Sequence, residues 1–410
     1  MTATPRNGFS PKRLSTVADV IFSNVDKLTQ ANEHPVMLCN YTDVYYNRQI
    51  RADLPFMRAT ATQAEIDRFR LKRGDVVITK DSETADDIAV PAYIAEEIPN
   101  LVCGYHLAIL RPNPSQLDGR FLVQLLQQQT MRHYFFTLAN GVTRFGLGVQ
   151  AIREAVLQLP GIFEQNKIAD ILITWDMALE NISALIAAKE RRKKGLMLQL
   201  LLGQKRLPGF KMRWNKRRIG ELLRSEDRYE KWDDSRKFKL AGVRRNAGGL
   251  FFRDELDGNQ IKVKTCKKIR AGDFLISRRQ ITYGGMAMVP PEFDGFDVND
   301  EYEVLVVREP NEFDMRFFNY FSQTARLKHA AYLASNGFFA ERLRLNFDLP
   351  AFLGHKICVP PTLNEQRRIA EILDDATEEI RLLRCQRGAL EKQKRGLMQR
   401  LLKGKIRIKV

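Results

Sequence analysis

The chain has 410 residues, of which 44% are apolar, so it has room for two or three domains with substantial cores. Its formal net charge of +17, most of which lies after residue 203, favours a polyanionic partner, nucleic acid first. No window approaches 18 consecutive apolar residues, and the first residues lack a signal-peptide pattern, which predicts a cytoplasmic protein without a membrane span.

Residues 1–162 alternate short apolar runs with turn residues, a pattern typical of an α+β domain. A Gly-Asp turn at Gly74 precedes a β-branched strand that ends at Lys80. Residues 101–110 predict one strand, and residues 121–138 predict one helix. A glycine-rich loop then leads to Pro160, which begins the turn into a long helix.

Residues 163–203 predict this long helix, because their apolar residues recur at alternating steps of three and four. The seam positions are Ile168, Leu172, Trp175, Leu179 and Ile182. This spacing is typical of a coiled coil. Gly203 follows a basic segment, as expected for a left-handed helix cap.

Residues 204–362 follow the plan of the first domain. The Gly-Asp turn recurs at Gly272 after a shift of 198 positions, which places Arg278 opposite Lys80. Residues 317–333 correspond to the helix predicted at 121–138, and residues 335–339 correspond to the glycine-bearing loop. Elsewhere the two domains differ in composition, so we expect them to be alike in plan only.

Residues 363–410 repeat the long helix and add a short tail. Residues 164–203 and 365–404 align without a gap at a shift of 201, with roughly fifteen of forty residues identical. The second seam comprises Ile369, Leu373, Ile380, Leu383 and Leu390, and Gly404 occupies the cap position. The chain is therefore organised as domain, helix, domain, helix.

A duplicated unit of this kind closes most simply about a pseudo-two-fold axis. The sequence thus predicts an α+β protein in which two α/β-mixed domains are separated by two long antiparallel coiled-coil helices. Helices of about 35 residues are roughly 50 Å long. That length fits two DNA half-sites one helical turn, about 34 Å, apart once the domains lean inward.

These motifs resemble the specificity subunit of type I restriction-modification systems. The resemblance is carried by the Glu-Gln-x-x-Ile-Ala-x-Ile-Leu segments from Glu164 and Glu365, and by the Gly-Leu-Met-x-x-Leu-Leu segments that follow Lys194 and Arg395. The two Gly-Asp motifs, the opening at Trp214 and the final Gly404-Lys-Ile-Arg also match. The opening at Pro11 departs from the tryptophan-led form, which leaves the start of the first domain open.

The resemblance implies a non-catalytic subunit. Its target recognition domains, residues 1–162 and 204–362, would each read one half of an asymmetric bipartite site in double-stranded DNA. Its helices, residues 163–203 and 363–410, would set the spacer and dock two modification (methyltransferase) subunits. Those subunits would hold S-adenosylmethionine and methylate adenine N6, and a separate restriction subunit would cleave the DNA. No cofactor or metal is expected in this chain.

The residues agree with this implication. The sequence lacks the Asn/Asp-Pro-Pro-aromatic loop with which an adenine methyltransferase holds a flipped base. It also lacks a Gly-x4-Gly-Lys-Ser/Thr phosphate loop, and its histidines and cysteines do not recur at metal-ligand spacing. Two alternatives stay open: a coiled-coil scaffold that binds protein, and a free-standing DNA-modifying enzyme with an unrecognised site.

The candidates for DNA contact are loop cations, amides and aromatic residues, because arginine reads guanine, asparagine reads adenine and lysine mostly holds phosphate. The ten candidates are Asn40, Tyr41, Arg48, Lys80 and Arg144 in the first domain, and Arg244, Arg245, Arg278, Arg279 and Tyr283 in the second. We expect at least half of them to lie on one face.

Overall fold

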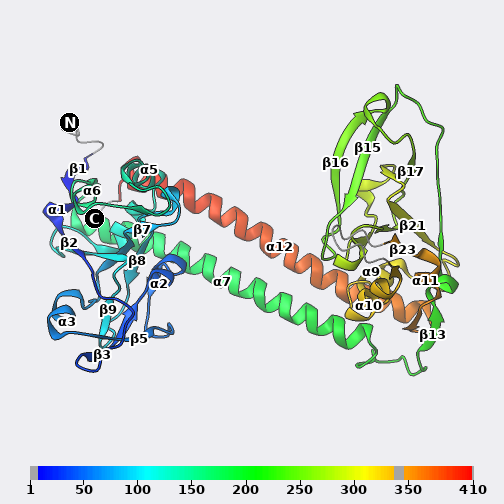
Figure 1. The fold of residues 1–410 in the computed structure, drawn as a ribbon, viewed down its shortest axis with the longest axis horizontal. Helices are drawn as coiled ribbons and strands as arrows, with labels where there is room; N and C mark the ends of the chain where they lie inside the picture. Colours follow the sequence, from blue (N-terminus) through cyan, green and yellow to red (C-terminus); the bar gives the residue numbers. More distant parts are fainter. Residues whose placement is uncertain (1–7, 337–345, 409–410) are drawn as a thin grey trace. The chain divides into compact units, whose positions relative to one another are not determined.

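The computed structural model describes residues 8–336 and 346–408, so most of the glycine-bearing loop predicted at 335–339 lies outside the described residues. The chain forms two compact units, Met1–Ser183 with Gln386–Val410, and Ala184–Cys385. The division cuts both long helices. Each unit therefore contains one globular domain and a part of each helix (Figure 1).

The first globular domain contains short helices and strands up to residue 159. In chain order they are β1 Ser10–Arg13, α1 Leu14–Val17, β2 Ala18–Phe22, β3 His34–Cys39, α2 Tyr41–Tyr46, β4 Gln49–Ile50, β5 Met57–Ala61, α3 Gln63–Phe69, β6 Val76–Thr79, β7 Asp81–Ser82, η1 Ala85–Asp87, β8 Pro91–Ile94, β9 Leu101–Cys103, β10 Leu107–Pro112, α4 Gly119–Leu126, α5 Gln129–Leu138, β11 Phe145–Gly146, α6 Val149–Arg153 and β12 Val156–Leu159. The main sheet has the order β2-β10-β6-β8-β4, and a second sheet has the order β5-β3-β9. Two short pairs, β1-β12 and β11-β7, complete the domain.

Two elements predicted as continuous are divided. The strand predicted at 101–110 is two strands, because the chain turns at Gly104 and passes from the second sheet into the main sheet. A Cβ at Gly104 would lie 2.8 Å from the carbonyl oxygen of Cys39, so this turn requires glycine. The helix predicted at 121–138 breaks at Gln128, whose backbone is extended, and the break lets Phe135 of α5 reach the same core as α4.

The second globular domain has a comparable plan with longer strands. In chain order it contains β13 Asn215–Arg218, α8 Ile219–Leu222, β14 Leu223–Ser225, β15 Lys237–Val243, β16 Leu250–Asp257, η2 Gly258–Gln260, β17 Cys266–Lys268, β18 Phe274–Ser277, η3 Ile281–Tyr283, β19 Met286–Met288, η4 Pro291–Phe293, β20 Asp297–Asn299, β21 Tyr302–Val307, α9 Met315–Phe321, α10 Ala325–Leu333, β22 Ser335–Asn336, β23 Asn346–Phe347, α11 Leu349–Gly354 and β24 Lys356–Val359. Its sheets have the orders β14-β21-β18-β19 and β16-β15-β20-β17, with the pairs β13-β24 and β22-β23. Here too the helix predicted at 317–333 is divided, because Thr324 caps a new helix, α10.

The Gly-Asp motif closes the same turn in both domains. Gly74 and Gly272 adopt φ values of +99° and +89°, which side chains with a Cβ rarely tolerate. The buried carboxylate of Asp75 accepts the Lys72 amide and two bonds from Arg111, at 2.8 and 2.7 Å. The equivalent Asp273 is held in the same way by the Arg270 amide and by Arg228. The motif therefore fixes the start of the buried strands β6 and β18.

The two long helices are α7, Ile162–Leu201, and α12, Leu363–Leu402. Gly203 and Gly404 follow them with φ values of +68° and +64°, which confirms the predicted left-handed caps. The predicted fold class is also confirmed: mixed α/β domains alternate along the chain with two long helices.

Within each unit the two helices run antiparallel. In the first unit, Asp176 contacts Lys394 while Glu164, earlier in α7, contacts Arg407, later in the chain. In the second unit, Glu190 contacts Arg384, and Arg206, beyond the end of α7, contacts Glu365 near the start of α12. The C-terminal part of one helix therefore packs beside the N-terminal part of the other.

Among the described residues, α7 is long and apolar enough to cross a membrane by composition, with a mean hydropathy of 1.4 over one 18-residue window. The sequence has no run of 18 consecutive apolar residues, so the prediction of no membrane span did not consider the high mean hydropathy of this helix. Length and composition are weak grounds for a span, because long helices of soluble proteins meet the same criteria. Part of the apolar surface of α7 is the seam against α12, where Asp176 is buried beside Lys394.

Candidate nucleic-acid interface

In each unit an arginine that follows the end of one long helix pairs with a glutamate at the start of the other. Arg407 donates to the buried carboxylate of Glu164 at 2.9 and 2.8 Å. Arg206 donates to the buried carboxylate of Glu365 at 2.9 and 3.0 Å. The hydrogen bonds from Arg407 hold the pKa of Glu164 below its ordinary value. We call these two contacts the clamps.

The glutamine next to each clamp makes a second, identical attachment. Gln165 accepts the Asp118 amide at 3.1 Å, and Gln366 accepts the Asp314 amide at 2.9 Å. Asp118 and Asp314 in turn cap α4 and α9. The Glu-Gln pair of the repeated motif thus ties each long helix to the same place in each domain.

Each clamp also has an aromatic residue beside its arginine, and the two aromatic residues occupy equivalent positions. Trp214 donates to Glu365 at 3.2 Å, and the Arg206 guanidinium lies over its ring. In the first domain the Arg407 guanidinium lies 5.4 Å from the ring centre of Phe9, which precedes β1 as Trp214 precedes β13. Phe9 therefore takes the place of the tryptophan whose absence left the first domain's start open.

The predicted seam residues lie on the inner side of the helices. Ile168, Leu172, Ile182, Ile369, Leu373 and Ile380 are buried, and Trp175, Leu179, Leu383 and Leu390 are partly buried. Near the helix ends the seam merges with the domain cores. Ile168 and Leu172 pack in the first core with Leu401, and Ile369 and Leu373 pack in the second core with Leu200.

A buried polar cluster interrupts the seam of the first unit, and the apolar periodicity gave no sign of it. Lys394 Nζ lies 2.5 Å from Asp176 Oδ1, and both side chains are less than a tenth exposed, at 8% and 7%. Gln124 of α4 donates to the same carboxylate at 3.1 Å, and Arg48 also pairs with it. Burial lowers the pKa of Lys394, and Asp176 counteracts this shift.

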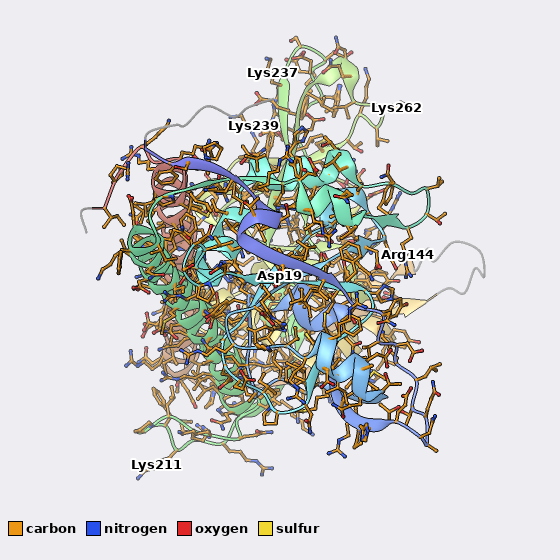
Figure 2. All side chains as sticks on the ribbon, turned by 90° about the vertical axis from the view of Figure 1, so that its left-hand side faces the viewer. Asp19, Arg144, Lys211, Lys237, Lys239 and Lys262 are labelled. Carbon is orange, nitrogen blue, oxygen red and sulfur yellow. The ribbon has the colours of Figure 1, made fainter. Side chains whose placement is uncertain are left out.

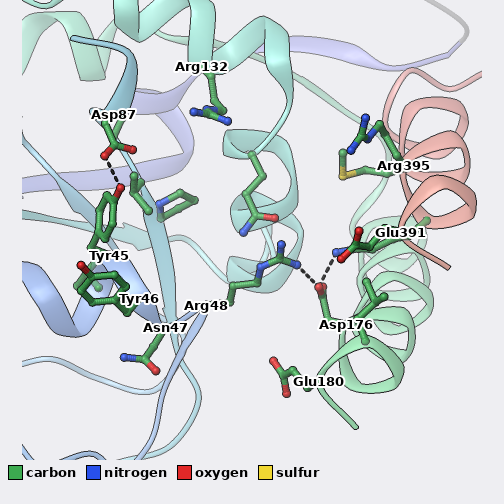
Figure 3. A pocket seen from close by; sticks show the side chains of 18 of the residues that line it. Tyr45, Tyr46, Asn47, Arg48, Asp87, Arg132, Asp176, Glu180, Glu391 and Arg395 are labelled. Atoms are coloured by element: carbon green, nitrogen blue, oxygen red, sulfur yellow. Dashed lines mark hydrogen bonds and ion pairs between the residues drawn. The ribbon is translucent and has the colours of Figure 1, made fainter. Parts of the chain in front are cut away.

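A groove of about 910 Å³ lies in the first unit where α2 and β8 face the two long helices (Figure 3). Tyr45, Tyr46, Arg48 and Asp87 line one wall, and the helices contribute acidic and basic side chains to the other. Tyr45 donates to Asp87, and Arg48 points at Asp176. The cations and carboxylates are balanced, and among the described residues no group of three or more His, Cys, Asp or Glu could hold a metal ion.

In the first domain, three of the candidates for DNA contact surround β7. The Tyr41 hydroxyl lies 3.4 Å from Ser82 Oγ, and the loop that carries Arg144 pairs with β7 through Phe145 and Gly146. Lys80, the residue before β7, is half-buried and donates to the Ser23 carbonyl at 2.8 Å; burial lowers its pKa. The exposed Arg144 makes no side-chain hydrogen bond or ion pair with any residue of the described ranges.

The other two first-domain candidates have partners within the first unit. Asn40 precedes α2, and its backbone N–H donates to the Asp43 carboxylate at 2.7 Å. Arg48 pairs with Asp176 of α7. It therefore links the domain to the helix pair and does not belong to the group around β7.

Tyr105 and His106 belong to the group around β7 and were not among the candidates from the sequence. Tyr105 is 37% exposed, and His106 Nδ1 lies 2.7 Å from Asp81 Oδ1. We call the surface formed by Tyr41, the 140–146 loop and Tyr105 the first rim.

In the second domain, the five candidates lie on two adjoining loops. The Arg245 guanidinium lies 4.8 Å from the ring centre of Tyr283, and Arg244 lies over Phe251. Arg278 pairs with the buried Glu303, and Arg279 pairs with Glu301. Tyr283 is 45% exposed. We call these loops, residues 244–249 and 278–284, the second rim.

Lysines also gather at the far end of the β15–β16 hairpin, where Lys237, Lys239 and Lys262 are found in Figure 2. Asp257 and Glu255 face Lys237 and Lys239 across the strand pair. Their charges offset one another, so this end is a weaker candidate for a polyanion than the second rim.

Residues 15–189 match the family model of the type I restriction modification DNA specificity domain. The MjaX type I restriction enzyme specificity subunit proposed for Methanocaldococcus jannaschii is 24% identical over 365 residues, which cover 85% of this chain and 82% of that protein.

Solved structures share the fold over nearly the whole chain. The S subunit of the type I restriction-modification system from M. genitalium aligns with a TM-score of 0.59 at 14% identity and covers 98% of both chains. A chain from a study of complex assembly and conformational transition of the type I R-M system aligns with a TM-score of 0.52 at 15% identity, covering 98% of this chain and 100% of the other. Residues 15–189 thus match a type I restriction modification DNA specificity domain, and the whole chain is similar in sequence and in fold to type I restriction-modification specificity subunits.

Proposed function

We propose that each globular domain reads one half of an asymmetric bipartite site in double-stranded DNA, and that α7 and α12 set the spacing between the halves about a pseudo-two-fold axis. One observation carries this proposal: the clamps are the same in both units, whereas the rims differ. The first rim exposes Tyr105 and Arg144, and the second exposes Arg245 and Tyr283. A constant frame that carries unlike polar surfaces suits a protein that reads two unlike sequences.

DNA binding tests this proposal. The chain, assembled with its modification subunit, is titrated against a library with two randomised half-sites at several salt concentrations. We expect a bipartite preference and an affinity that falls with rising salt, because cations on the rims displace counterions from phosphate. Affinity that is independent of salt, or a preference confined to one continuous sequence, would contradict it.

We propose further that two modification subunits dock on the helices, hold the S-adenosylmethionine and methylate adenine, and that a restriction subunit joins the same cytoplasmic complex. Equivalent glycines support this docking. Gly195 of α7 and Gly396 of α12 lie inside helices, and a Cβ at either one would meet no atom of the described residues within 4 Å. Glycine weakens a helix interior, and the chain's own packing does not require it here, so a closely approaching partner explains both positions.

Substitution of these glycines tests the docking. Gly195→Gln and Gly396→Gln should leave the fold intact, because the space is open, and should weaken assembly with the modification subunit. Glu391→Gln, at an exposed α12 position, is the control. Size-exclusion chromatography of the mixed subunits measures the outcome, and unchanged assembly in both glycine variants would remove this docking site.

The alternatives predict different behaviour. A free-standing enzyme would methylate or cleave DNA when the chain alone receives S-adenosylmethionine or magnesium ions, and we expect no product. A scaffold would form protein complexes of fixed stoichiometry without affinity for DNA.

A further inference from the structure

The turn that joins β15 to β16, residues 244–249, has an unusual backbone. Asn246 and Ala247 both adopt a φ of +55°, although neither is glycine. Asparagine enters this left-handed region more readily than other residues with a side chain, whereas alanine does so only at an energetic cost. Such conformations persist where the surrounding structure enforces them, and they concentrate at functional sites.

The neighbouring loop enforces this conformation. The backbone N–H of Asn246 donates to the Tyr283 carbonyl at 2.7 Å, and the backbone N–H of Ala247 donates to the Gly284 carbonyl at 3.0 Å. The Arg245 guanidinium lies over the Tyr283 ring, and Arg244 donates to the Leu250 carbonyl at 3.1 Å. The backbone of the turn is thus fixed on the second rim, and both arginines beside Asn246 are already engaged.

The side chain of Asn246 is left available. It is exposed and makes no side-chain hydrogen bond with any residue in 8–336 or 346–408. The side-chain amide of Asn246 offers one donor and one acceptor side by side. This pattern matches adenine in the major groove, where N7 accepts a hydrogen bond and N6 donates one. A two-stranded β-ribbon fits that groove. The flexible end of Lys328 lies close to Gly284 and supplies a cation for phosphate beside the turn.

We propose that Asn246 is a base-reading residue that recognises an adenine in one half of the DNA site, presented by the rigid β15–β16 turn. The proposal rests on the proposed function and names one residue and one base within it. Arg244 and Arg245 then position the turn, Lys328 holds phosphate beside it, and the side-chain amide of Asn246 supplies the sequence information.

Three variants test it in the assembled complex with the modification subunit. Asn246→Gly keeps the left-handed turn and removes the amide, and Asn246→Asp keeps the turn but leaves only acceptors. Asn259→Ala removes an exposed asparagine at the opposite end of the same hairpin and is the control. Selection from a library with both half-sites randomised measures the preference at every position.

Asn246→Gly should reduce the preference for adenine at one position of one half-site by about tenfold and leave the other half-site unchanged. Asn246→Asp should shift that position towards cytosine, whose N4 donates a hydrogen bond. Asn259→Ala should select the wild-type sequence. An unchanged preference in Asn246→Gly, or a weakening spread evenly over all positions while thermal unfolding stays normal, would overturn the assignment. A wild-type complex without bipartite preference would instead defeat the proposed function.

Discussion

Asp176 receives donors from three parts of the first unit: Arg48 beside β4, Gln124 of α4 and Lys394 of α12. The repeat places Thr377 at the equivalent position of the second unit and Lys193 opposite it. There Lys193 lies over the ring of Tyr320, whose hydroxyl donates to Asp374 at 2.7 Å. The two units therefore use different polar contacts at the same place in the seam, and Asp176 joins the first domain to both helices.

Substitutions of Asp176 and Lys394 should have unequal effects. Asp176→Leu leaves Lys394 buried without a counter-charge and removes the acceptor of Gln124, and should cost about 3–5 kcal/mol of unfolding free energy. Lys394→Met should cost less, about 1–2 kcal/mol, because the carboxylate keeps Arg48 and Gln124. Urea denaturation measures both values, and equal losses would contradict the convergence of donors on Asp176.

Glu164 should make stability depend on pH. Arg407 and the Ile408 amide hold its folded pKa below the ordinary value of 4.5, so its stabilisation is present above that value and is lost as the pH falls through the lowered pKa. Glu164→Gln should therefore unfold at a lower temperature than the wild type at pH 7. The gap should shrink as the pH falls below about 4.5. A gap that stays constant down to pH 3 would show that the carboxylate charge contributes nothing.

At the scale of elements, the long helices depend on glycine in two opposite ways. Gly203 and Gly404 end α7 and α12 with positive φ, where a Cβ is strained. Gly195 and Gly396 lie inside the helices, where the part of the chain that the structure describes leaves open space for a Cβ. One residue type therefore stabilises a helix end and weakens a helix interior.

Alanine at these glycines should change stability in opposite directions. Gly203→Ala should destabilise the chain by about 1 kcal/mol, because alanine is strained at a φ of +68°. Gly195→Ala should stabilise it by about 0.5–1 kcal/mol, because alanine loses less conformational entropy in a helix. Thermal unfolding of the two variants side by side measures the signs, and a shared sign would contradict the cap assignment.

At the scale of the whole molecule, the chain repeats its attachments and varies its exposed surfaces. Both clamps, both glutamine attachments and both Gly-Asp turns recur with the same geometry. The first rim and the second rim, in contrast, present different residues. This is the arrangement expected if spacing is constant and sequence choice is adjustable.

Lengthening both helices should lengthen the spacer of the DNA site. Seven residues inserted after Ser183 in α7 and after Cys385 in α12 preserve the heptad pattern and add about 10 Å, or about three base pairs. An insertion in α7 alone should shift the α7–α12 contacts that follow it, such as Glu190 with Arg384, and should weaken assembly with the modification subunit. Seven residues in the loop at Lys262 are the control and should leave the spacer unchanged. Selection from a library of variable spacers measures the result, and an unaltered spacer in the double insertion would refute the helical ruler.

The sequence by itself determined the duplication, the two long helices, their glycine caps and the Gly-Asp turns. These features depend on periodicity and on local backbone conformation, which neighbouring residues largely decide. It failed where packing overrides local preference: at Gly104, where the chain changes sheets, and at Gln128, where a helix divides without a glycine or proline signal.

Only the tertiary structure decided which candidate cations are available to a partner. Arg48, Arg278 and Arg279 are similar to Arg144 in the sequence, yet each pairs with a carboxylate far along the chain or across a sheet, and Lys80 is bound to a backbone carbonyl. The tertiary structure also revealed the Asp176 cluster and the strained turn at Asn246. Whether a charge or an amide is free depends on partners brought together by folding, and no local pattern records those partners.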